Sequence, residues 1–376
     1  MAQKRQQIAE AFHPGDMLQE KLEELGMPIK EFALRCGKPE PTIHAVLQGK
    51  SSVTPDMAIL FEKVLGIPAH LWLNLQCQFD EYKARQQHDE ELQKGKEWAR
   101  HFPFGDMVAK GYINAPRKCS PLDKIKALLS FFGFGKTTVW RKYYQCQILK
   151  AEFRLSLSGI PEAPSLSAWL RYGENKAMEQ FDIPVFSNEN LKAQLPKMQA
   201  LANAGKSDFL SELIQLCKEV GIILVCTPHL RNSMARGATR WLKDTPLVQV
   251  SDSYKRYDIF WFSFFHELGH ILLHGKREVF LEGLEYEQKN YEKEQEADDF
   301  AANCLIPRTV AAKLNSFIYS EKALNEFCKR NQLHKAFVIG RLHHLGLLNQ
   351  SIGNQHIPSI DFTMFATSTE DSVSSF

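Results

Sequence analysis

The residues best suited to chemistry lie in one pentapeptide, HELGH at 266–270, which is an HExxH motif. In a helix, positions i and i+4 lie on one face, so the imidazoles of His266 and His270 can reach a single metal ion. Glu267 then stands beside that ion, where it can act as a general base. Apolar residues on both sides of the motif favour a helix. The pattern predicts a zinc site that hydrolyses peptide bonds.

A catalytic zinc site needs three protein ligands and one position that is open to water. Downstream, residues 294–298 read EQEAD, and Glu294 and Asp298 share one face of the expected helix. Glu294 can complete the coordination, while Asp298 can orient a histidine ligand. Glu296 competes for the ligand role. We prefer Glu294, because Glu296 points away from Asp298 in a regular helix, but the choice stays open.

A third histidine, His274, follows His270 by four residues. Eight residues of helix span about 12 Å, so one ion cannot bind both His266 and His274 at about 2.1 Å. We expect His274 to pack or to support a ligand. Cleavage also needs a donor that stabilises the oxyanion, and residue type offers several candidates. They are Arg240, Tyr286, Arg341, His343 and His344.

The elements that would position these residues belong to a chain of several regions. Residues 1–76 carry only short helical patterns and predict an all-α domain, and residues 77–184 predict a helical connecting region. Residues 185–350 predict an α+β domain with a small sheet, because short β-branched runs at 221–226 and 247–250 indicate strands. Residues 351–376 are rich in Ser and Thr and predict a flexible tail. The fold class is therefore multidomain and mainly α.

Composition excludes several classes of protein. The 376 residues include 46 basic and 44 acidic side chains, a net charge of +2, which argues against a polybasic nucleic-acid coat. There is no uninterrupted apolar stretch long enough for a membrane span, and we expect no membrane partner. The first 25 residues lack the apolar region of a secretory signal. The eight cysteines form no CxxC pair, so we expect reduced thiols and a cytoplasmic location.

Three stretches of the C-terminal half resemble the ImmA/IrrE family of zinc metallopeptidases. They are residues 237–280, EKEQEADDFAANCLIP at 292–307 and VIGRLHHLGLL at 338–348. The resemblance covers roughly residues 185–350. It implies a gluzincin-like fold and proteolysis of a specific partner, typically a repressor.

The same resemblance implies roles for individual residues. The zinc ion would be bound by His266, His270 and Glu294, with Glu267 as the base. His344 lies where the family has the histidine of its GRLxH motif, so it is the favoured oxyanion residue.

The front of the chain, residues 13–76, resembles the HigA-type antitoxin helix-turn-helix, a branch of the XRE repressors. By that match, residues 29–36 form the positioning helix and residues 40–48 the recognition helix. Repressors of this type usually bind two half-sites, so we expect a homodimer. The candidates for DNA contact are Thr42, His44 and Gln48 at base edges and Lys38 and Lys50 near phosphates.

Charge supports an alternative role for this front domain. Residues 1–76 hold eight basic and nine acidic side chains, so the domain has little electrostatic attraction to phosphate. The alternative is a helical fold that serves dimerisation or partner docking. Basic residues gather instead at 231–256, six against two acidic ones, which could form a partner surface.

The leading hypothesis is a cytoplasmic zinc endopeptidase fused to a domain that binds operator DNA, a regulator that cleaves a repressor or antitoxin-like protein. One alternative is an antitoxin or transcriptional regulator whose zinc domain has no turnover. The presence of Glu267 argues against it, because a structural site needs no general base. Another alternative is the toxin effector of a toxin–antitoxin system.

Overall fold

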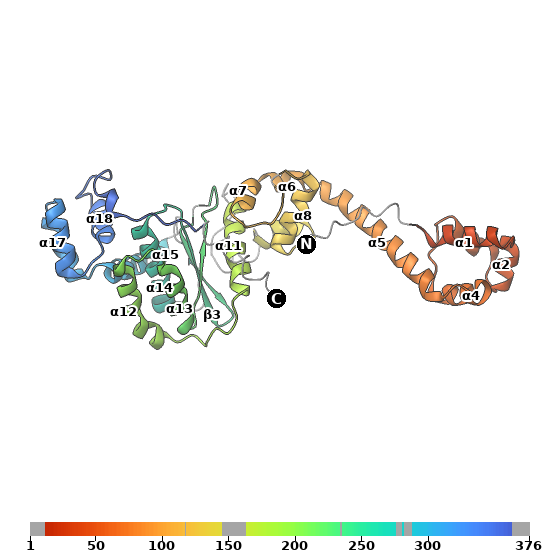
Figure 1. Ribbon diagram of the computed structural model, residues 1–376, viewed down its shortest axis with the longest axis horizontal. Helices are drawn as coiled ribbons and strands as arrows, with labels where there is room; N and C mark the ends of the chain where they lie inside the picture. Colours follow the sequence, from red (N-terminus) through yellow and green to blue (C-terminus); the bar gives the residue numbers. More distant parts are fainter. Residues whose placement is uncertain are drawn as a thin grey trace. The chain divides into compact units, whose positions relative to one another are not determined.

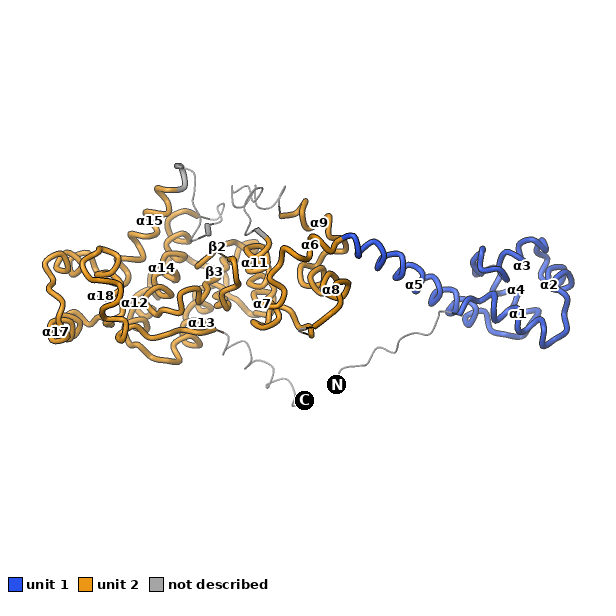
Figure 2. The backbone as a smooth tube through the Cα atoms, turned by 90° about the horizontal axis from the view of Figure 1, so that it is seen from above, with its two compact units in different colours: residues 1–94 blue, residues 95–376 orange. Residues whose placement is uncertain are grey.

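The computed structural model describes residues 12–116, 118–144, 163–233, 235–275, 280–281 and 288–362 (Figure 1). In these residues the chain is mainly helical with one small sheet, which confirms the predicted fold class. The chain divides into two compact units, residues 1–94 and residues 95–376 (Figure 2). The boundaries predicted at residues 76, 184 and 350 stay predictions. Among the described residues, no helix has the length and apolar composition that a membrane crossing requires.

The first unit is a helical domain around an apolar core. Its helices are α1 (Pro14–Glu24), α2 (Ile29–Arg35), α3 (Glu40–Leu47), α4 (Pro55–Leu65) and α5 (Ala69–Gln93). Phe32, Phe61 and Trp72 are fully buried at its centre, and the Phe61 and Trp72 rings meet edge to face. Helix α5 runs on without a break past residue 76, so the last predicted helix of the domain and the predicted connecting helix are one element.

The second unit begins with short helices and then forms a sheet. The helices are α6 (Lys96–Arg100), α7 (Phe104–Ala109), α8 (Pro121–Phe132), α9 (Thr137–Lys142) and α11 (Ala163–Met178). Aromatic contacts hold α6, α8 and α9 together: the Trp140 ring lies 6.0 Å from that of Trp98 and 6.3 Å from that of Phe132. This region is helical, as predicted, and α11 packs on the sheet.

The sheet has the strand order β1-β3-β2-β4. The strands are β1 (Ile223–Thr227), β2 (Gly237–Leu242), β3 (Thr245–Ser251) and β4 (Phe280–Leu281). Strand β3 pairs in parallel with β1 and antiparallel with β2, while β2 also pairs antiparallel with β4. The runs predicted as strands correspond to β1 and β3. The sequence has no comparable signal for β2, since Thr239 is the single β-branched residue among its six residues, GATRWL.

The two faces of the sheet carry different helices. Along β3, Leu247 packs with Ala177 of α11, whereas Val248 belongs to the core formed with the helices of the other face. That second face is covered by α13 (Phe209–Glu219) and α14 (Tyr257–His274). Because successive side chains in a strand alternate between faces, β2 also presents Thr239 to α14 and Arg240 to α11.

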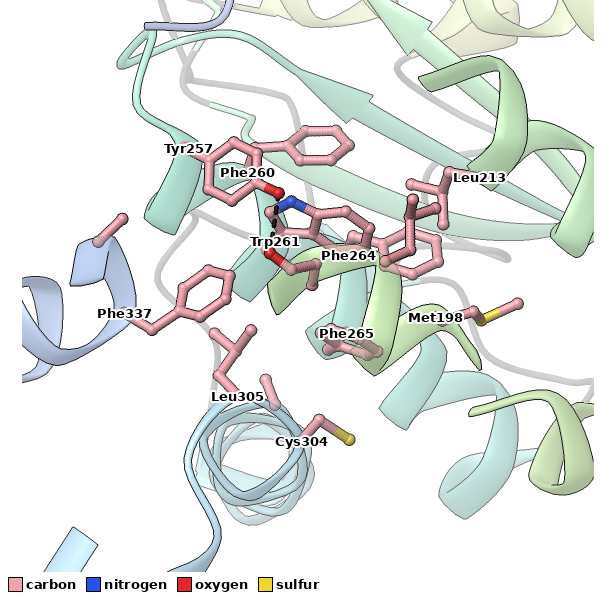
Figure 3. Close-up of a cluster of buried hydrophobic side chains, with 14 of the residues drawn as sticks. Met198, Leu213, Tyr257, Phe260, Trp261, Phe264, Phe265, Cys304, Leu305 and Phe337 are labelled. Carbon is pink, nitrogen blue, oxygen red and sulfur yellow. Dashed lines mark hydrogen bonds between the residues drawn. The ribbon is translucent and has the colours of Figure 1, made fainter. Parts of the chain in front are cut away.

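The remaining helices enclose the core behind α14. They are α12 (Asn188–Ala204), α15 (Gln288–Leu305), α16 (Arg308–Ala311), α17 (Glu321–Asn331) and α18 (Lys335–His344), with 3₁₀ helices at Ala312–Ser316 and Asn354–His356. Figure 3 shows Trp261 of α14 at the centre of this core, among Phe264, Phe337 and Leu213. Trp261 is fully buried. The core therefore fixes α14, the helix that carries the HExxH motif.

The segment after residue 350 differs in part from the predicted flexible tail. Residues 351–362 return to the core: the backbone N–H of Tyr257 donates to the carbonyl of Pro358 at 3.0 Å, and Phe362 is 2% exposed. The apolar side chains Ile360 and Phe362, which the Ser- and Thr-rich composition obscured, are what bury this segment. Residues 363–376 lie outside the described residues.

Helices α14 and α15 approach each other closely at Gly269. A Cβ atom built on Gly269 would lie 3.2 Å from the Cα of Ala297 and 3.2 Å from a ring carbon of Phe300. Ala297 and Ala301 are both fully buried. The small residues on both helices thus bring the motif of α14 next to the acidic residues of α15.

Replacing Gly269 with valine should force the two helices apart. Overpacking of a close helix contact lowers the free energy of unfolding by about 1–3 kcal/mol. At about 2–4 °C per kcal/mol, we expect the thermal midpoint to fall by several degrees. Gly105→Val is the matched control, because a Cβ at Gly105 meets nothing within 4 Å. Thermal unfolding followed by circular dichroism makes the comparison. Equal midpoints for the two variants would contradict the close packing.

Candidate metal centre

Two histidines of α14 and one glutamate of α15 converge on one point. The Nε2 atoms of His266 and His270 lie 2.9 Å apart. The Glu294 carboxylate lies 3.2 Å from the first of them and 3.5 Å from the second. Ligand atoms held about 2.0–2.2 Å from one ion at tetrahedral angles are separated by about 3.3 Å. The three residues therefore have the spacing that a bound metal ion requires.

The surroundings of these residues fit a metal as well. Both imidazoles are 1% exposed. Burial lowers the pKa of His270 well below its usual value, and the neighbouring His266 and His274 lower it further, so the ring is neutral, as a metal ligand must be. The Oε1 atom of Glu294 is buried and accepts no hydrogen bond from any described residue. A cation between the three groups would satisfy it.

Each histidine ligand is supported on its other ring nitrogen. Nδ1 of His266 lies 2.8 Å from Oδ1 of Asp298, the residue predicted to orient a ligand. Nδ1 of His270 lies 3.0 Å from Nδ1 of His274, whose Nε2 lies 2.9 Å from Glu296.

The hydrogen bonds from His270 through His274 to Glu296 determine which ring nitrogens carry protons. When Nε2 of His270 binds a metal, its proton is on Nδ1 and is donated to Nδ1 of His274. The proton of His274 is then on Nε2, from which it is donated to Glu296. Glu294 belongs to the group of three residues that could hold a metal ion, whereas Glu296 is linked to His270 only through His274.

Glu267 faces the sheet. Its side chain is 0% exposed, and its Oε2 accepts a hydrogen bond from the hydroxyl of Thr239 at 2.6 Å. A Cβ on Gly237 would lie 2.3 Å from the Oε1 atom of Glu267, so only glycine leaves room for the carboxylate. Strand β2 therefore determines where this carboxylate lies. Sequence reasoning missed Thr239 and Gly237, since nothing in the local pattern marks β2 as a strand.

A cleft of about 570 Å³ opens beside the metal position. Its lining includes His266, Glu294 and Asp298, and Arg341 and His344 of α18 also line it. His344 is exposed, as a residue that meets a substrate must be.

The other oxyanion candidates lie elsewhere. Arg240 is on the opposite face of the sheet, where it pairs with Glu174 at 2.6 Å. The ring of His343 is buried, and its Nε2 lies 2.9 Å from the carbonyl of Ile352. Tyr286 lies outside the described residues. Among the described candidates, only Arg341 and His344 line the cleft.

The residues predicted to contact DNA belong to the first unit. His44 and Gln48 lie on or directly after α3 and are exposed, as is Lys50, while Thr42 and Lys38 are half-buried. His44 lies 3.6 Å from Glu40, one turn earlier on the same helix. The helices α2 and α3 thus present a polar surface at the positions that the helix-turn-helix resemblance assigns to DNA contact.

Comparison with known proteins agrees with this division of the chain. Residues 18–72 match the helix-turn-helix family, and residues 218–337 match the IrrE N-terminal-like domain, peptidase family M78. Over 63 residues the chain is 43% identical to YddM of Escherichia coli K12, an uncharacterised HTH-type transcriptional regulator, covering 17% of this chain and 67% of that protein.

Two solved structures are similar to the front of the chain. One is a putative antidote protein of a plasmid maintenance system from Nostoc punctiforme, 37% identical over 23% of this chain and 94% of that one, with a TM-score of 0.23. The other is a HigA-family addiction module antidote protein from Coxiella burnetii, 31% identical over 23% of this chain and 95% of that one, with a TM-score of 0.22.

Exchange of Glu294 for glutamine should weaken metal binding far more than the same exchange at Glu296. Loss of a residue that only orients a ligand costs about 10- to 100-fold in affinity, so we expect Glu296→Gln near the lower figure and Glu294→Gln beyond the higher one. Glu292→Gln, exposed on the same helix, is the control. Competition with a chromophoric chelator measures the affinities. Equal losses of metal affinity in Glu294→Gln and Glu296→Gln would contradict Glu294 as the third ligand.

Proposed function

We propose that this chain, which joins a helix-turn-helix DNA-binding domain resembling HigA antitoxins to an IrrE N-terminal-like peptidase domain, is a zinc-dependent endopeptidase that cleaves a specific protein partner. The observation that carries the proposal is the convergence of His266, His270 and Glu294, with the buried Glu267 next to them on the same helix. Two imidazoles and one carboxylate are the donor set of catalytic zinc sites that keep a position open.

The chain's own residues have separate roles in hydrolysis. A zinc ion in this site would polarise the substrate carbonyl and make water more acidic. Glu267 removes the proton from the attacking water and then delivers it to the leaving amine. The Thr239 hydroxyl donates to Oε2 of Glu267 at 2.6 Å and so holds the carboxylate in one orientation for this proton transfer. Asp298 and the pair His274–Glu296 fix the ring orientations of the two histidine ligands.

The negative charge that develops on the substrate oxygen needs a donor from the open side of the site. His344 of α18 lines the same cleft as His266 and Glu294. We assign it the oxyanion role, in agreement with its place in the GRLHH stretch. An imidazole N–H aimed at the developing oxyanion stabilises the transition state more than the ground state.

The first unit would bring the peptidase to its site of action. A helix-turn-helix domain implies DNA binding, and residues 1–76 would bind operator DNA as a homodimer in the cytoplasm. The substrate would be a repressor or antitoxin-like protein. The exposed side chains of His44 and Gln48 on the recognition helix support base contacts, and Lys50 supports a phosphate contact.

A second candidate is a toxin–antitoxin component. The similarity of residues 18–72 to regulators supports a transcriptional role in which the metal domain senses or binds without turnover. The buried Glu267, which directly follows His266 and accepts a hydrogen bond from Thr239, favours catalysis over that role.

A survey of new protein N-termini in cells tests the proposed activity. Cells that express the wild type should contain new termini from one or a few proteins. Glu267→Gln should abolish them while the purified variant still binds zinc, because the base is not a ligand. His270→Ala should lose both zinc and cleavage. Identical termini in wild-type and Glu267→Gln cells would refute the peptidase.

Selection of DNA fragments by the full-length protein tests the first unit. We expect the wild-type protein to enrich DNA fragments that share a palindromic site. Gln48→Ala should lose about 1–3 kcal/mol of discrimination at one base pair, because a side chain at the base edge is removed. Lys50→Ala should weaken binding to all DNA sequences alike. It should also reduce the slope of log affinity against log salt concentration by about one. Failure to enrich any sequence would favour the docking role instead.

A further inference from the structure

The cleft beside the metal position is a groove between three helices. Its walls are residues of α14 from Asp258 to His266, residues of α15 from Glu294 to Leu305 with Ile306 directly after it, and residues of α18 from Phe337 to His344. Eight residues of helix separate Asp258 from His266, so the groove extends about 12 Å from the metal position. An extended peptide advances about 3.3 Å per residue, and three or four of its residues would fill this length.

Several side chains that line the groove are apolar, beginning with Phe262, whose ring centroid lies 6.3 Å from that of His266. The apolar lining residues are Ile259 and Phe262 of α14, Leu305 at the end of α15, Ile306 directly after it, and Phe337 of α18. Ala302 faces the same space and leaves room between the larger side chains. A cavity walled by aliphatic and aromatic groups accepts a large apolar side chain of a substrate.

The charged groups along the groove are not balanced. Two carboxylates of the lining have a cationic partner: Asp258 pairs with Arg256 at 2.7 Å, and Asp299 with Arg308 at 3.6 Å. The guanidinium of Arg341 is half-buried and makes no ion pair or hydrogen bond with any residue that the structure describes.

Arg341 also lines a second, smaller cavity. This cavity of about 70 Å³ is lined by Arg341, Ala302 and Ile306, which line the main groove as well. Arg341 therefore lines both spaces. Its planar group of donors matches a carboxylate with two parallel hydrogen bonds.

We propose that the groove selects substrates in which a large apolar side chain is followed or preceded, within about four residues, by a carboxylate, and that Arg341 is the specificity-determining residue that binds this carboxylate. The apolar side chain fills the space beside Phe262 and Phe337. This inference rests on the proposed peptidase function and names the class of peptide that the site takes. The carboxylate belongs to an aspartate or glutamate side chain or to a peptide C-terminus.

Binding to an inactive protein tests the inference without turnover. The probe is a set of fluorescent, end-blocked peptides of alanine with one central leucine. One glutamate is placed at each position up to four residues on either side, and each peptide has a glutamine twin. The full-length Glu267→Gln protein, loaded with zinc, is titrated into each peptide, and anisotropy gives the dissociation constants.

In at least one register, the glutamate peptide should bind about tenfold more tightly than its glutamine twin, as charge-assisted hydrogen bonds allow. Adding Arg341→Gln should abolish the difference, and Arg341→Lys should restore part of it. Adding Arg330→Gln, an exposed arginine of α17, should leave it intact. Replacing the leucine with alanine should weaken all peptides. A peptide shortened to end at the preferred position, as a free acid or as an amide, distinguishes the two sources of the carboxylate.

The inference is overturned when glutamate and glutamine peptides bind alike in every register, when the preference survives Arg341→Gln, or when no peptide binds. Its failure differs from failure of the proposed function. Cleavage in cells without any acidic preference would remove only the specificity. A preference that depends on Arg341, in a wild-type protein that cleaves nothing, would remove only the activity.

Discussion

The close contact between α14 and α15 is the constraint on which the rest of the structure depends. A metal site built from HExxH and a remote glutamate exists only when the two helices approach within the reach of one ion. Gly269, Ala297 and Ala301 permit that approach, because none of them has a side chain larger than a methyl group. The result is a carboxylate that lies 3.2 Å from one imidazole and 3.5 Å from the other.

The surrounding elements hold this pair of helices in place from several sides. The aromatic core around Trp261 fixes α14 in place (Figure 3). Strand β2 places the Thr239 hydroxyl against the carboxylate of Glu267. On the opposite face of the sheet, the buried guanidinium of Arg240 bonds to Glu174 and to the carbonyl of Leu170. Buried charges of this kind need such partners, and here they join the sheet to α11. The same strand thus serves the site on one face and the fold on the other.

The sequence allowed the motif helix, the supporting Asp298 and the helix-turn-helix pair to be predicted, because each depends on spacing within one helix or on turn residues nearby. It did not allow the environment of Glu267 to be predicted. Thr239 and Gly237 meet Glu267 only through the register of β2, and the mixed composition of β2 hides the strand. The choice between Glu294 and Glu296 also depended on tertiary contacts, since both lie on one helix and only the rotation of α15 against α14 separates them. The packing of residues 351–362 was not predicted either. Their composition is polar, and the burial of Ile360 and Phe362 depends on tertiary contacts.

The most direct test of the account is the coordination of zinc in the full-length protein, measured by crystallography at the zinc absorption edge. The account predicts one ion held by the Nε2 atoms of His266 and His270 and by the carboxylate of Glu294, at about 2.0–2.2 Å, with a fourth position open to solvent. An ion bound elsewhere in the chain, or one enclosed by four protein ligands, would contradict the claim that this contact between two helices forms a catalytic centre.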